Sequence, residues 1–400
     1  MTIKNTTQLI PDFRMPGNFK FGAGAHKNLV EDIKVYSPKK IAIVSDKGVA
    51  QAGLVDKLKE VLASAETPIF TFTDISGEPT FKLVENVANI LREKNCDLVI
   101  GIGGGSALDV AKTAAALLLI EDKQPFLSGN QQIGSRKTPC ILLPTTSGTG
   151  SEVTMNAIFG DEEQELKRGI VSPALLPDLA IVDPELTMSC PPRVSASSGV
   201  DAFTHAIESY ISVRATPLTK IFAEKAMRLF PHYITRAVHN GSDLEARTGM
   251  GWVSALAGVS LANAGVGAVH ALAYPLGGKY HIEHGVANAL LMPYVFEKIG
   301  TTCTNEMVDV ASFLQLGDFT QKPVKALEAV VQYLFDLLDV LDLPTNLKDL
   351  GIDESALSEL ANSAVKVERL LANTPFKLSE DSIKEIYINS YRGKVGARTK

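Results

Sequence analysis

The sequence predicts an α/β domain built on a parallel sheet, followed by an all-helical domain. In the first half, short apolar runs alternate with stretches of helical periodicity, which is typical of βαβ units. In the second half, helical periodicity continues almost to the end of the chain. The 400 residues suffice for about two or three domains. We place the boundary near residues 185–195, with residues 1–190 as the α/β domain and residues 191–400 as the helical domain.

The expected elements follow one another in a regular order. In the first half, strands are predicted within residues 39–48, 67–76, 96–105 and 138–150, and helices within 55–64, 83–95 and 106–120. In the second half, helices are predicted within 218–234, 324–341, 354–371 and 380–391, with breaks at the prolines Pro191, Pro192, Pro293 and Pro344.

Composition argues against several classes of partner. The formal net charge is -6 and no long Lys/Arg run occurs, so nucleic acid and anionic membranes are not expected partners. The four cysteines lie far apart without a CxxC pair, and the N-terminal residues contain no apolar signal core. We therefore expect a reduced, cytoplasmic protein.

One stretch resembles a membrane span by charge alone. No charged residue occurs between Arg247 and Lys279. The stretch consists mainly of Ala, Gly and Ser, and His270 lies within it, whereas membrane spans are rich in Leu, Ile and Phe. It is better interpreted as a buried region of small-residue helices, with Trp252 in the core.

A glycine-rich loop follows the third expected strand. The residues "GGGS" are Gly103, Gly104, Gly105 and Ser106. Glycines allow a close approach of the backbone to a ligand, and the N–H groups of the next helix turn point at an anion. The loop departs from the strict G-x-G-x-x-G pattern, so a tight strand–helix turn without a ligand remains an alternative.

The helix after this loop carries two further polar residues. Ser106 and Asp109 have the spacing of a capping box, and Lys112 is expected on the solvated face.

A second loop rich in Gly, Thr and Ser follows the fourth expected strand. Residues 144–154, "PTTSGTGSEVT", contain Thr145, Thr146 and Thr149. Their hydroxyl and N–H groups are suitable donors to a pyrophosphate. Two such loops at the ends of sheet strands suggest a nucleotide in the crevice between them.

Asp46 ends the first expected strand of the chain, within residues 39–48. A carboxylate there accepts hydrogen bonds from a ribose and repels a 2′-phosphate, which favours NAD over NADP. An Asp in an ordinary turn is the alternative.

Four residues of the second half suggest a metal site. Asp201 and His205 lie one helical turn apart in "DAFTHAIESY", which has the appearance of a helix start. Taken alone, the pair is compatible with an N-capping Asp and a core His. His270 and His284 extend the set to three imidazoles and one carboxylate, which suits a divalent first-row metal. We assign no role to His281.

The motifs together resemble those of the iron-containing (group III) alcohol dehydrogenases. The resemblance rests on "GGGSALDVAK", "TTSGTGSE", "GVDAFTHAIESY" and "HALAYPLGG…HGVANALLMPYV", in matching order from about residue 10 to 395. It implies a Rossmann-like parallel-sheet domain and a helical domain of the dehydroquinate synthase-like type, with the active cleft between them.

The resemblance also implies which residues bind the ligands. Those implied for the metal are Asp201, His205, His270 and His284. Those implied for NAD(P) are Asp46, Gly103, Gly104, Gly105, Ser106, Thr145, Thr146, Thr149, Asn156 and Lys167.

The implied activity is the metal-dependent interconversion of a primary alcohol or diol and its aldehyde with NAD(H). A Lewis-acidic metal lowers the pKa of the alcohol, and Fe²⁺ is the metal that the resemblance favours, although Zn²⁺, Ni²⁺ and Mn²⁺ also accept this ligand set. Alternatives are a dehydrogenase of the same fold acting on glycerol, 4-hydroxybutyrate or another hydroxy acid, and an inactive nucleotide-binding protein. A homodimer is expected.

Two positions depart from the family pattern. Tyr274 stands where many members have a second His that is thought to help move the proton, and Glu283 stands where many have Pro. Tyr274 is therefore the expected catalytic residue, with an open role in proton transfer.

Overall fold

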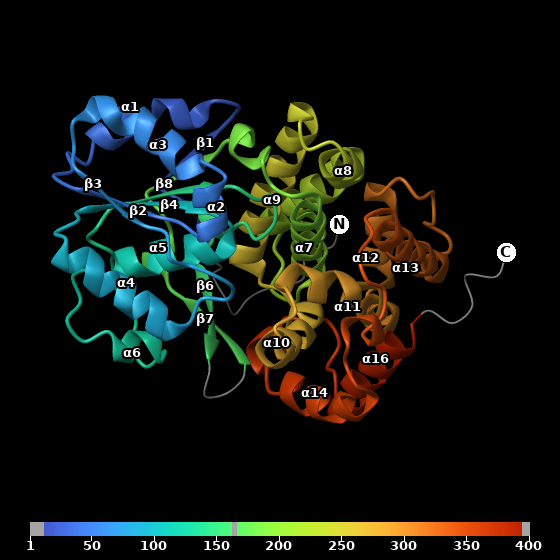
Figure 1. Ribbon diagram of the computed structural model, residues 1–400. Helices are drawn as coiled ribbons and strands as arrows, with labels where there is room; N and C mark the ends of the chain where they lie inside the picture. Colours follow the sequence, from blue (N-terminus) through green and yellow to red (C-terminus); the bar gives the residue numbers. More distant parts are fainter. Residues whose placement is uncertain (1–11, 162–165, 394–400) are drawn as a thin grey trace.

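The computed structural model describes residues 12–161 and 166–393. The chain forms two parts that lie side by side, an α/β part built from the first half of the chain and a helical part built from the second half (Figure 1). The predicted fold class is confirmed. The last strand of the sheet ends at Val182, and the first long helix begins at Pro192.

The α/β part contains a six-stranded parallel sheet with the order β1-β8-β5-β4-β2-β3. The strands are β1 (Asn18–Phe21), β2 (Ile41–Val44), β3 (Ile69–Phe72), β4 (Leu98–Gly103), β5 (Cys140–Pro144) and β8 (Leu179–Val182). Four of them fall within the predicted ranges, whereas β1 and β8 were not predicted. A separate antiparallel hairpin consists of β6 (Asn156–Asp161) and β7 (Leu166–Val171).

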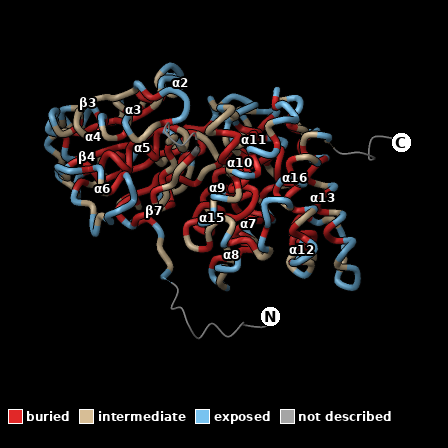
Figure 2. The backbone as a smooth tube through the Cα atoms, turned by 90° about the horizontal axis from the view of Figure 1, so that it is seen from below, coloured by how far each residue is buried: buried red, intermediate tan, exposed pale blue. Residues whose placement is uncertain are grey.

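The sheet is apolar on both faces because helices cover both. Residues of β2, β4, β5 and β8 are buried throughout, as expected for a parallel sheet between two helical layers. Figure 2 shows buried residues in the interior of the molecule and exposed residues mainly at its periphery. The helices of this part are α1 (Leu29–Lys34), α2 (Lys47–Gln51), α3 (Leu54–Leu62), α4 (Phe81–Glu93), α5 (Gly105–Leu117) and α6 (Gln124–Leu127).

The order of the strands creates a switch point between β2 and β4. From β2 the chain first adds β3 on one side and then returns to add β4 on the other. The carboxyl ends of these two strands carry Asp46 and the glycine-rich loop. Ligands of open α/β sheets bind in the crevice at such a switch point.

The helical part is arranged around α7 (Pro192–Ile211), which is buried along most of its length. The other helices of this part are α8 (Pro217–His239), α9 (Leu244–Ala264), α10 (Ala268–Tyr280), α11 (His284–Ile299), α12 (Thr304–Phe313), α13 (Pro323–Val340), α14 (Leu357–Ala364), α15 (Glu368–Leu371) and α16 (Glu380–Arg392).

The prediction that "DAFTHAIESY" starts a helix is wrong. The helix α7 begins at Pro192, so Asp201 lies in its interior and cannot be the N-cap. Proline fits the first helical position because its missing N–H has no partner there in any case. The polar and small residues between Pro192 and Asp201 concealed the first two turns.

The long uncharged stretch forms α9 and α10, which meet at an angle of 100°. No single helix within the described residues is long and apolar enough to cross a membrane. Only α9 and α10 taken together have the length and the apolar composition of a membrane span. Trp252 is not in the core as expected: it is 37% exposed and stacks on Phe21 of the edge strand, with ring centroids 3.8 Å apart.

The two parts meet at a close approach of their backbones. A Cβ atom on Gly150 would lie 2.6 Å from the Cα atom of Gly258 on α9, and Gly150 has a φ of +61°. Only glycine satisfies both conditions comfortably. The small residues of α9 therefore bring the second glycine-rich loop against the helical part.

Candidate active site

The four residues predicted to bind a metal converge in space. Asp201 and His205 lie one turn apart on α7, His270 lies in the first turn of α10, and His284 is the first residue of α11. One ligand atom from each of the four lies within 4.8 Å of the others. Asp201, His205 and His270 are buried, and His284 is half-buried.

A single carboxylate oxygen lies at the centre of this group. Asp201 Oδ1 is 3.6 Å from Nε2 of His270, 3.8 Å from Nε2 of His205 and 3.9 Å from Nε2 of His284. In a tetrahedral site with metal–ligand bonds of about 2.1 Å, the ligand atoms are roughly 3.4 Å apart. The observed separations are slightly larger than this edge length.

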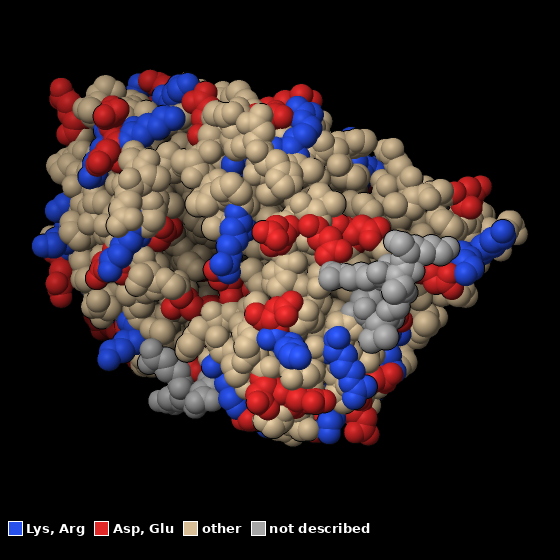
Figure 3. All heavy atoms as spheres, turned by 45° about the vertical axis from the view of Figure 1, so that its right-hand side comes forward, with Lys and Arg blue, Asp and Glu red and all other residues tan. Residues whose placement is uncertain are grey.

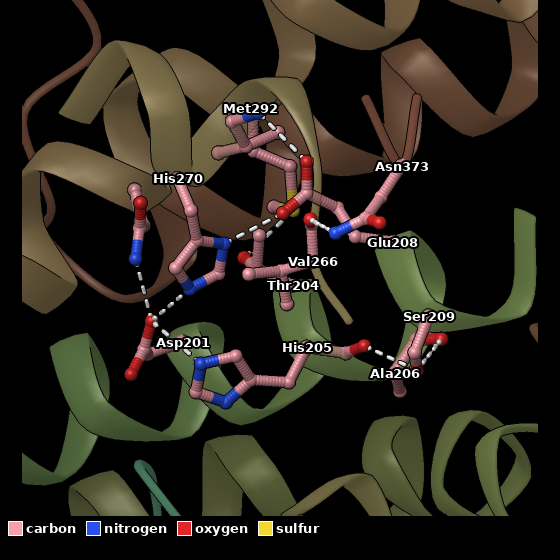
Figure 4. Close-up of polar contacts among 12 residues, drawn as sticks. Asp201, Thr204, His205, Ala206, Glu208, Ser209, Val266, His270, Met292 and Asn373 are labelled. Atoms are coloured by element: carbon pink, nitrogen blue, oxygen red, sulfur yellow. Dashed lines mark hydrogen bonds and ion pairs between the residues drawn. The ribbon is translucent and has the colours of Figure 1, made fainter. Parts of the chain in front are cut away.

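Glu208 orients His270 from the side opposite Asp201 (Figure 4). Its Oε2 atom accepts a hydrogen bond of 2.6 Å from His270 Nδ1, and its Oε1 atom accepts one of 2.7 Å from the backbone N–H of Val269. Glu208 is only 2% exposed. A carboxylate on the second nitrogen of a histidine fixes the tautomer in which the other nitrogen is free to bind a metal.

Asn288 lies one turn beyond His284 on α11 and is fully buried. Its Nδ2 atom donates to Asp201 Oδ1 at 2.7 Å and lies 3.1 Å from His284 Nε2. The amide therefore holds the carboxylate of α7 against the first turn of α11.

The electrostatics of the cluster favour a positive charge at its centre. Burial raises the pKa of Asp201, but the three imidazoles outweigh burial and hold this pKa well below its usual value. Burial lowers the pKa values of His205 and His284 despite the carboxylate nearby. Burial also disfavours charge on His270, but Asp201 and Glu208 outweigh it and raise the pKa of His270 to about 9.

The donor set fits a divalent cation. Nε2 of His270 is buried and has no hydrogen-bond partner among the described residues, although it faces Asp201. An unpartnered buried nitrogen beside a buried carboxylate is unfavourable unless an ion completes the pair. Three imidazoles and one carboxylate suit Fe²⁺, Zn²⁺ and related metals.

The two glycine-rich loops lie beside each other at the carboxyl ends of β4 and β5. The N–H of Thr145 donates to the carbonyl of Gly103 at 2.9 Å. A Cβ atom on Gly105 would lie 2.6 Å from Cγ2 of Thr149, so the loops pack without space for a larger residue. Asp46 caps α2 by accepting from the Val49 N–H at 2.9 Å, and one of its oxygens would lie 2.9 Å from a Cβ atom on Gly103.

Two predictions about α5 are wrong. Lys112 is not solvated: it is fully buried, and its Nζ atom lies 3.0 Å from Asp109 Oδ1 and 2.9 Å from both Oγ and the carbonyl oxygen of Ser151. Ser106 and Asp109 form no capping box, because Asp109 accepts hydrogen bonds from the Ser151 hydroxyl and the Ile158 N–H. The second loop covers this face of α5 and removes it from water.

A cavity of about 740 Å³ lies between the two parts. The predicted site residues that line it are Gly105, Ser106, Thr149, Asn156, Lys167, Asp201, His205, His270, Tyr274 and His284. The predicted residues that do not line it are Asp46, Gly103, Gly104, Thr145 and Thr146. The metal-ligand candidates and part of the phosphate-loop candidates therefore share one cavity.

Lys167 and Tyr274 lie where α10 meets the β6–β7 hairpin. Lys167 is buried and forms an ion pair with Glu78. It passes so close to α10 that a Cβ atom on Gly277 would lie 2.3 Å from its Cε atom. Burial raises the pKa of Tyr274 to about 12, so its hydroxyl stays protonated at neutral pH. The rings of Tyr274 and His284 are 6.3 Å apart.

Several residues of the site escaped the sequence prediction. Glu208 lies seven residues after Asp201, two helical turns on the same face of α7, which was an available signal. Asn288 lies four residues after His284, again on one face. Arg214 and Arg369 also line the cavity, and no spacing rule connects them with the other site residues.

Comparison with known proteins identifies relatives for both parts. The model of a family described as iron-containing alcohol dehydrogenase matches residues 16–184, and the model described as Fe-containing alcohol dehydrogenase family, C-terminal, matches residues 195–391. The long-chain-alcohol dehydrogenase 1 of Geobacillus thermodenitrificans is 41% identical over 94% of this chain and 95% of its own.

Two further relatives extend the comparison. The sulfoacetaldehyde reductase of Bilophila wadsworthia is 35% identical over 90% of this chain and 94% of its own. A crystal structure of 1,3-propanediol oxidoreductase superposes with a TM-score of 0.90 at 32% identity, covering 96% of this chain and 100% of the other.

Proposed function

Because the chain belongs to the iron-containing alcohol dehydrogenase family, and is thus an NAD-dependent alcohol dehydrogenase, we propose that Asp201 and three histidines bind its metal. The histidines are His205, His270 and His284. The observation that carries this assignment is their convergence on one carboxylate oxygen in the cavity that Gly105 and Ser106 also line. We propose Fe²⁺ as the metal, with Zn²⁺, Ni²⁺ and Mn²⁺ as competitors for the same donors.

When bound, the divalent metal supplies a Lewis acid that favours loss of the alcohol proton. The protein has three tasks around that chemistry. Glu208 keeps Nε2 of His270 directed at the centre of the cluster, and Asn288 fixes the Asp201 carboxylate. The burial of Asp201, His205 and His270 keeps bulk water away from the ligand atoms.

We propose that NAD binds along the carboxyl ends of β2, β4 and β5. A position at the carboxyl ends of these strands supports a role for Asp46, Gly103, Gly104, Gly105, Ser106, Thr145, Thr146 and Thr149. Asn156 and Lys167 belong to the β6–β7 hairpin, and their place in the lining of the same cavity supports a role for them. The N-terminus of α5 directs its free N–H groups at the loop, where a pyrophosphate is favoured. Asp46 favours NAD over NADP because its carboxylate repels a 2′-phosphate.

Tyr274 is proposed to contact the reacting alcohol or aldehyde. It lines the cavity beside His284, and its raised pKa keeps the hydroxyl neutral. A neutral phenol can donate a hydrogen bond to the substrate oxygen or pass a proton onward, whereas it cannot serve as an anionic base at neutral pH.

The proposed reaction interconverts a primary alcohol or diol and its aldehyde. Relatives named for long-chain alcohols and for 1,3-propanediol support this range. A hydroxy acid or another anionic alcohol is the second candidate, since the sulfoacetaldehyde reductase is also closely similar. Glycerol stays an alternative within the same fold.

The test combines metal analysis with turnover. Protein purified without oxygen should contain close to one equivalent of Fe²⁺, and NADH should form from primary alcohols faster than NADPH does from the same alcohols with NADP. A protein that contains its metal and binds NAD but oxidises no alcohol in a broad panel would contradict the proposal.

We further propose a homodimer that works in the cytoplasm. β1 is an edge strand, and edge strands offer unpaired N–H and C=O groups to a second chain. Phe21 and Trp252 form a partly exposed aromatic pair at the same edge. The four cysteines are free, as expected for a reducing compartment. Sedimentation equilibrium measures the oligomeric state.

A further inference from the structure

Asn373 lines the cavity between the two parts, and it belongs neither to the candidate metal ligands nor to the residues proposed to bind NAD. Figure 3 shows a face of the molecule that is hollowed between its two parts, with basic and acidic side chains at the edge of the hollow. Asn373 differs from such residues because it is only 5% exposed. A buried amide needs hydrogen-bond partners, so the contacts of Asn373 indicate its role.

The backbone of Asn373 is fixed on both sides. Its N–H group donates to the carbonyl of Leu370 at 3.0 Å, just after the end of α15. Its carbonyl accepts from the N–H group of Val213 at 2.9 Å, and Val213 follows α7. The segment after α15 is therefore tied to the end of the helix that carries Asp201 and His205.

The side chain of Asn373 reaches the turn between α9 and α10, which consists of Gly265, Val266 and Gly267. Its Nδ2 atom donates to the carbonyl oxygen of Val266 at 2.8 Å, in a buried hydrogen bond (Figure 4). Helix α10 does not use this carbonyl, since the first backbone bond that enters the helix joins the Ala271 N–H to the Gly267 carbonyl. Loss of the amide would leave the buried carbonyl without this donor, which is unfavourable.

The turn also packs closely against residues 373 and 374. A Cβ atom on Gly265 would lie 2.5 Å from Nδ2 of Asn373, and one on Gly267 would lie 2.8 Å from Oγ1 of Thr374. Gly265 has a φ of +75°, which favours glycine. Because no space separates the turn from the segment after α15, a change in one displaces the other.

The turn leads directly to a candidate metal ligand, because His270 is the third residue of α10. Glu208 holds the same part of α10 from the side of α7, where it accepts from the Val269 N–H and from the His270 ring. Asn373 acts on the turn one residue earlier than α10, through the Val266 carbonyl. The start of α10 is therefore fixed from two sides.

We propose that Asn373 is a positioning residue of the metal site and acts through the turn before α10. This inference rests on the proposed function, because it takes His270 as a metal ligand. The groups of such a site must be held within about 0.5 Å of the productive geometry. Asn373 fixes the Val266 carbonyl and with it the start of α10. The position of α10 in turn sets the separation of 3.6 Å between Nε2 of His270 and Oδ1 of Asp201.

The first experiment measures metal affinity by competition with a chelator. Asn373→Leu keeps the branched shape of the side chain and removes the donor. The dissociation constant of the metal should rise about tenfold, which is at the lower end of the range for groups that support a ligand from outside.

A matched control separates this effect from the loss of a buried hydrogen bond in general. Ser260→Ala removes a buried bond of 3.0 Å from a side chain to a carbonyl, that of Thr219, which joins the interior of α9 to α8. Both variants should unfold at a lower urea concentration than the wild type. Ser260→Ala should nevertheless keep the wild-type metal affinity.

The second experiment fills the site with Co²⁺, whose visible absorption depends on the coordination geometry. At saturating Co²⁺, the spectrum of Asn373→Leu should differ from that of the wild type, because His270 approaches the ion from a changed position. Ser260→Ala should give the wild-type spectrum. If Asn373→Leu does not fold, Asn373→Ala, which only shortens the side chain, is measured in the same way.

The outcomes separate this inference from the proposed function. Wild-type affinity and a wild-type Co²⁺ spectrum in the folded Asn373 variant would overturn the inference, because the amide would then contribute only stability or, if the KM for the alcohol rises, contact the substrate. An equal loss of affinity in Ser260→Ala would also overturn it. Failure of the wild-type protein to bind a divalent metal would refute the proposed function instead.

Discussion

The α/β part and the helical part both bury charged side chains, but they satisfy them differently. Beneath the glycine-rich loops, Lys112 and Asp109 pair with each other, and hydroxyl and backbone groups occupy their remaining hydrogen-bonding positions. In the helical part, Asp201 faces three imidazoles, and Nε2 of His270 has no hydrogen-bond partner among the described residues.

The difference separates structure from function. A buried ion pair with complete hydrogen bonding needs nothing further, and removing one member leaves an uncompensated charge. A cluster in which a buried nitrogen without a hydrogen-bond partner faces a carboxylate would be completed by a cation. The first arrangement should therefore govern folding stability, and the second should govern metal content and turnover.

The largest expected effect comes from the carboxylate of the helical part. Asp201→Asn removes the only negative charge among the four candidate ligands, so we expect almost complete loss of bound metal and roughly a thousandfold loss of kcat. Elemental analysis and NADH formation measure the two effects. Asp336→Asn, on the exposed face of α13, is the matched control. Full metal content in Asp201→Asn would contradict the claim that the cluster of the helical part governs metal binding.

The α/β part should respond with a loss of stability. Lys112→Met leaves Asp109 buried without its counter-ion, which is expected to lower the free energy of unfolding by about 3–5 kcal/mol. Urea unfolding measures it, with Lys82→Met on the exposed face of α4 as control. Metal content per folded molecule should stay at the wild-type level. A variant that is stable but loses its metal would reverse the roles assigned to the two parts.

Sequence reasoning succeeded where local chemistry is strong. The strand–helix alternation identified β2, β3, β4 and β5, because a parallel sheet between helices requires continuous apolar runs. The three histidines and Asp201 stood out because polar groups among apolar neighbours need a partner. Their convergence in space follows from the packing of α10 and α11 against α7, which the sequence does not encode in any spacing.

Sequence reasoning failed where tertiary contacts decide. Lys112 resembled a solvated residue because the second loop, which buries it, is far away along the chain. The start of α7 was hidden because its first turns are polar and small. Arg214 and Arg369 were not singled out in the sequence, because only the folded chain brings them to the cavity.

Burial disfavours the charged form of one acid of the α/β part, Glu152. The stability of this part should therefore depend on pH. Burial raises the pKa of Glu152 from its ordinary value of 4.5 to about 7, although Lys112 and a backbone N–H act in the opposite direction. The folded state thus holds a proton that the unfolded state releases first. Relative to Glu152→Gln, the wild-type protein should lose about 2–4 kcal/mol of stability between pH 4.5 and 7.

This prediction is checked by urea unfolding of both proteins across that range. The difference between them should be small at the acidic end and should level off above the folded-state pKa. A difference that does not change across the range would mean that folding leaves the pKa of Glu152 at its ordinary value, which would contradict the prediction.

The smallest effect, and the most specific, concerns Glu208. Each of its two oxygens accepts from one N–H group, that of Val269 and that of the His270 ring. A glutamine offers one oxygen and one NH₂ group. In Glu208→Gln the NH₂ group must therefore face one of these two N–H groups, and two donors then point at each other. The ring is then no longer fixed in the orientation and tautomer that expose Nε2. Metal affinity should fall roughly 10–100-fold, as is typical for residues that support a ligand from outside.

The design of the measurement separates positioning from a general loss of structure. Affinity is measured by competition with a chelator, and kcat is measured again at saturating metal. A positioning role predicts that kcat recovers most of its value once the site is filled, whereas a damaged fold does not recover. Glu224→Gln, which removes an exposed carboxylate paired with Arg228 on α8, is the matched control and should leave both quantities unchanged. If Glu208→Gln bound metal as tightly as wild type, the orientation of His270 Nε2 would not depend on Glu208. Metal affinity would then depend on Asp201 and the three histidines alone.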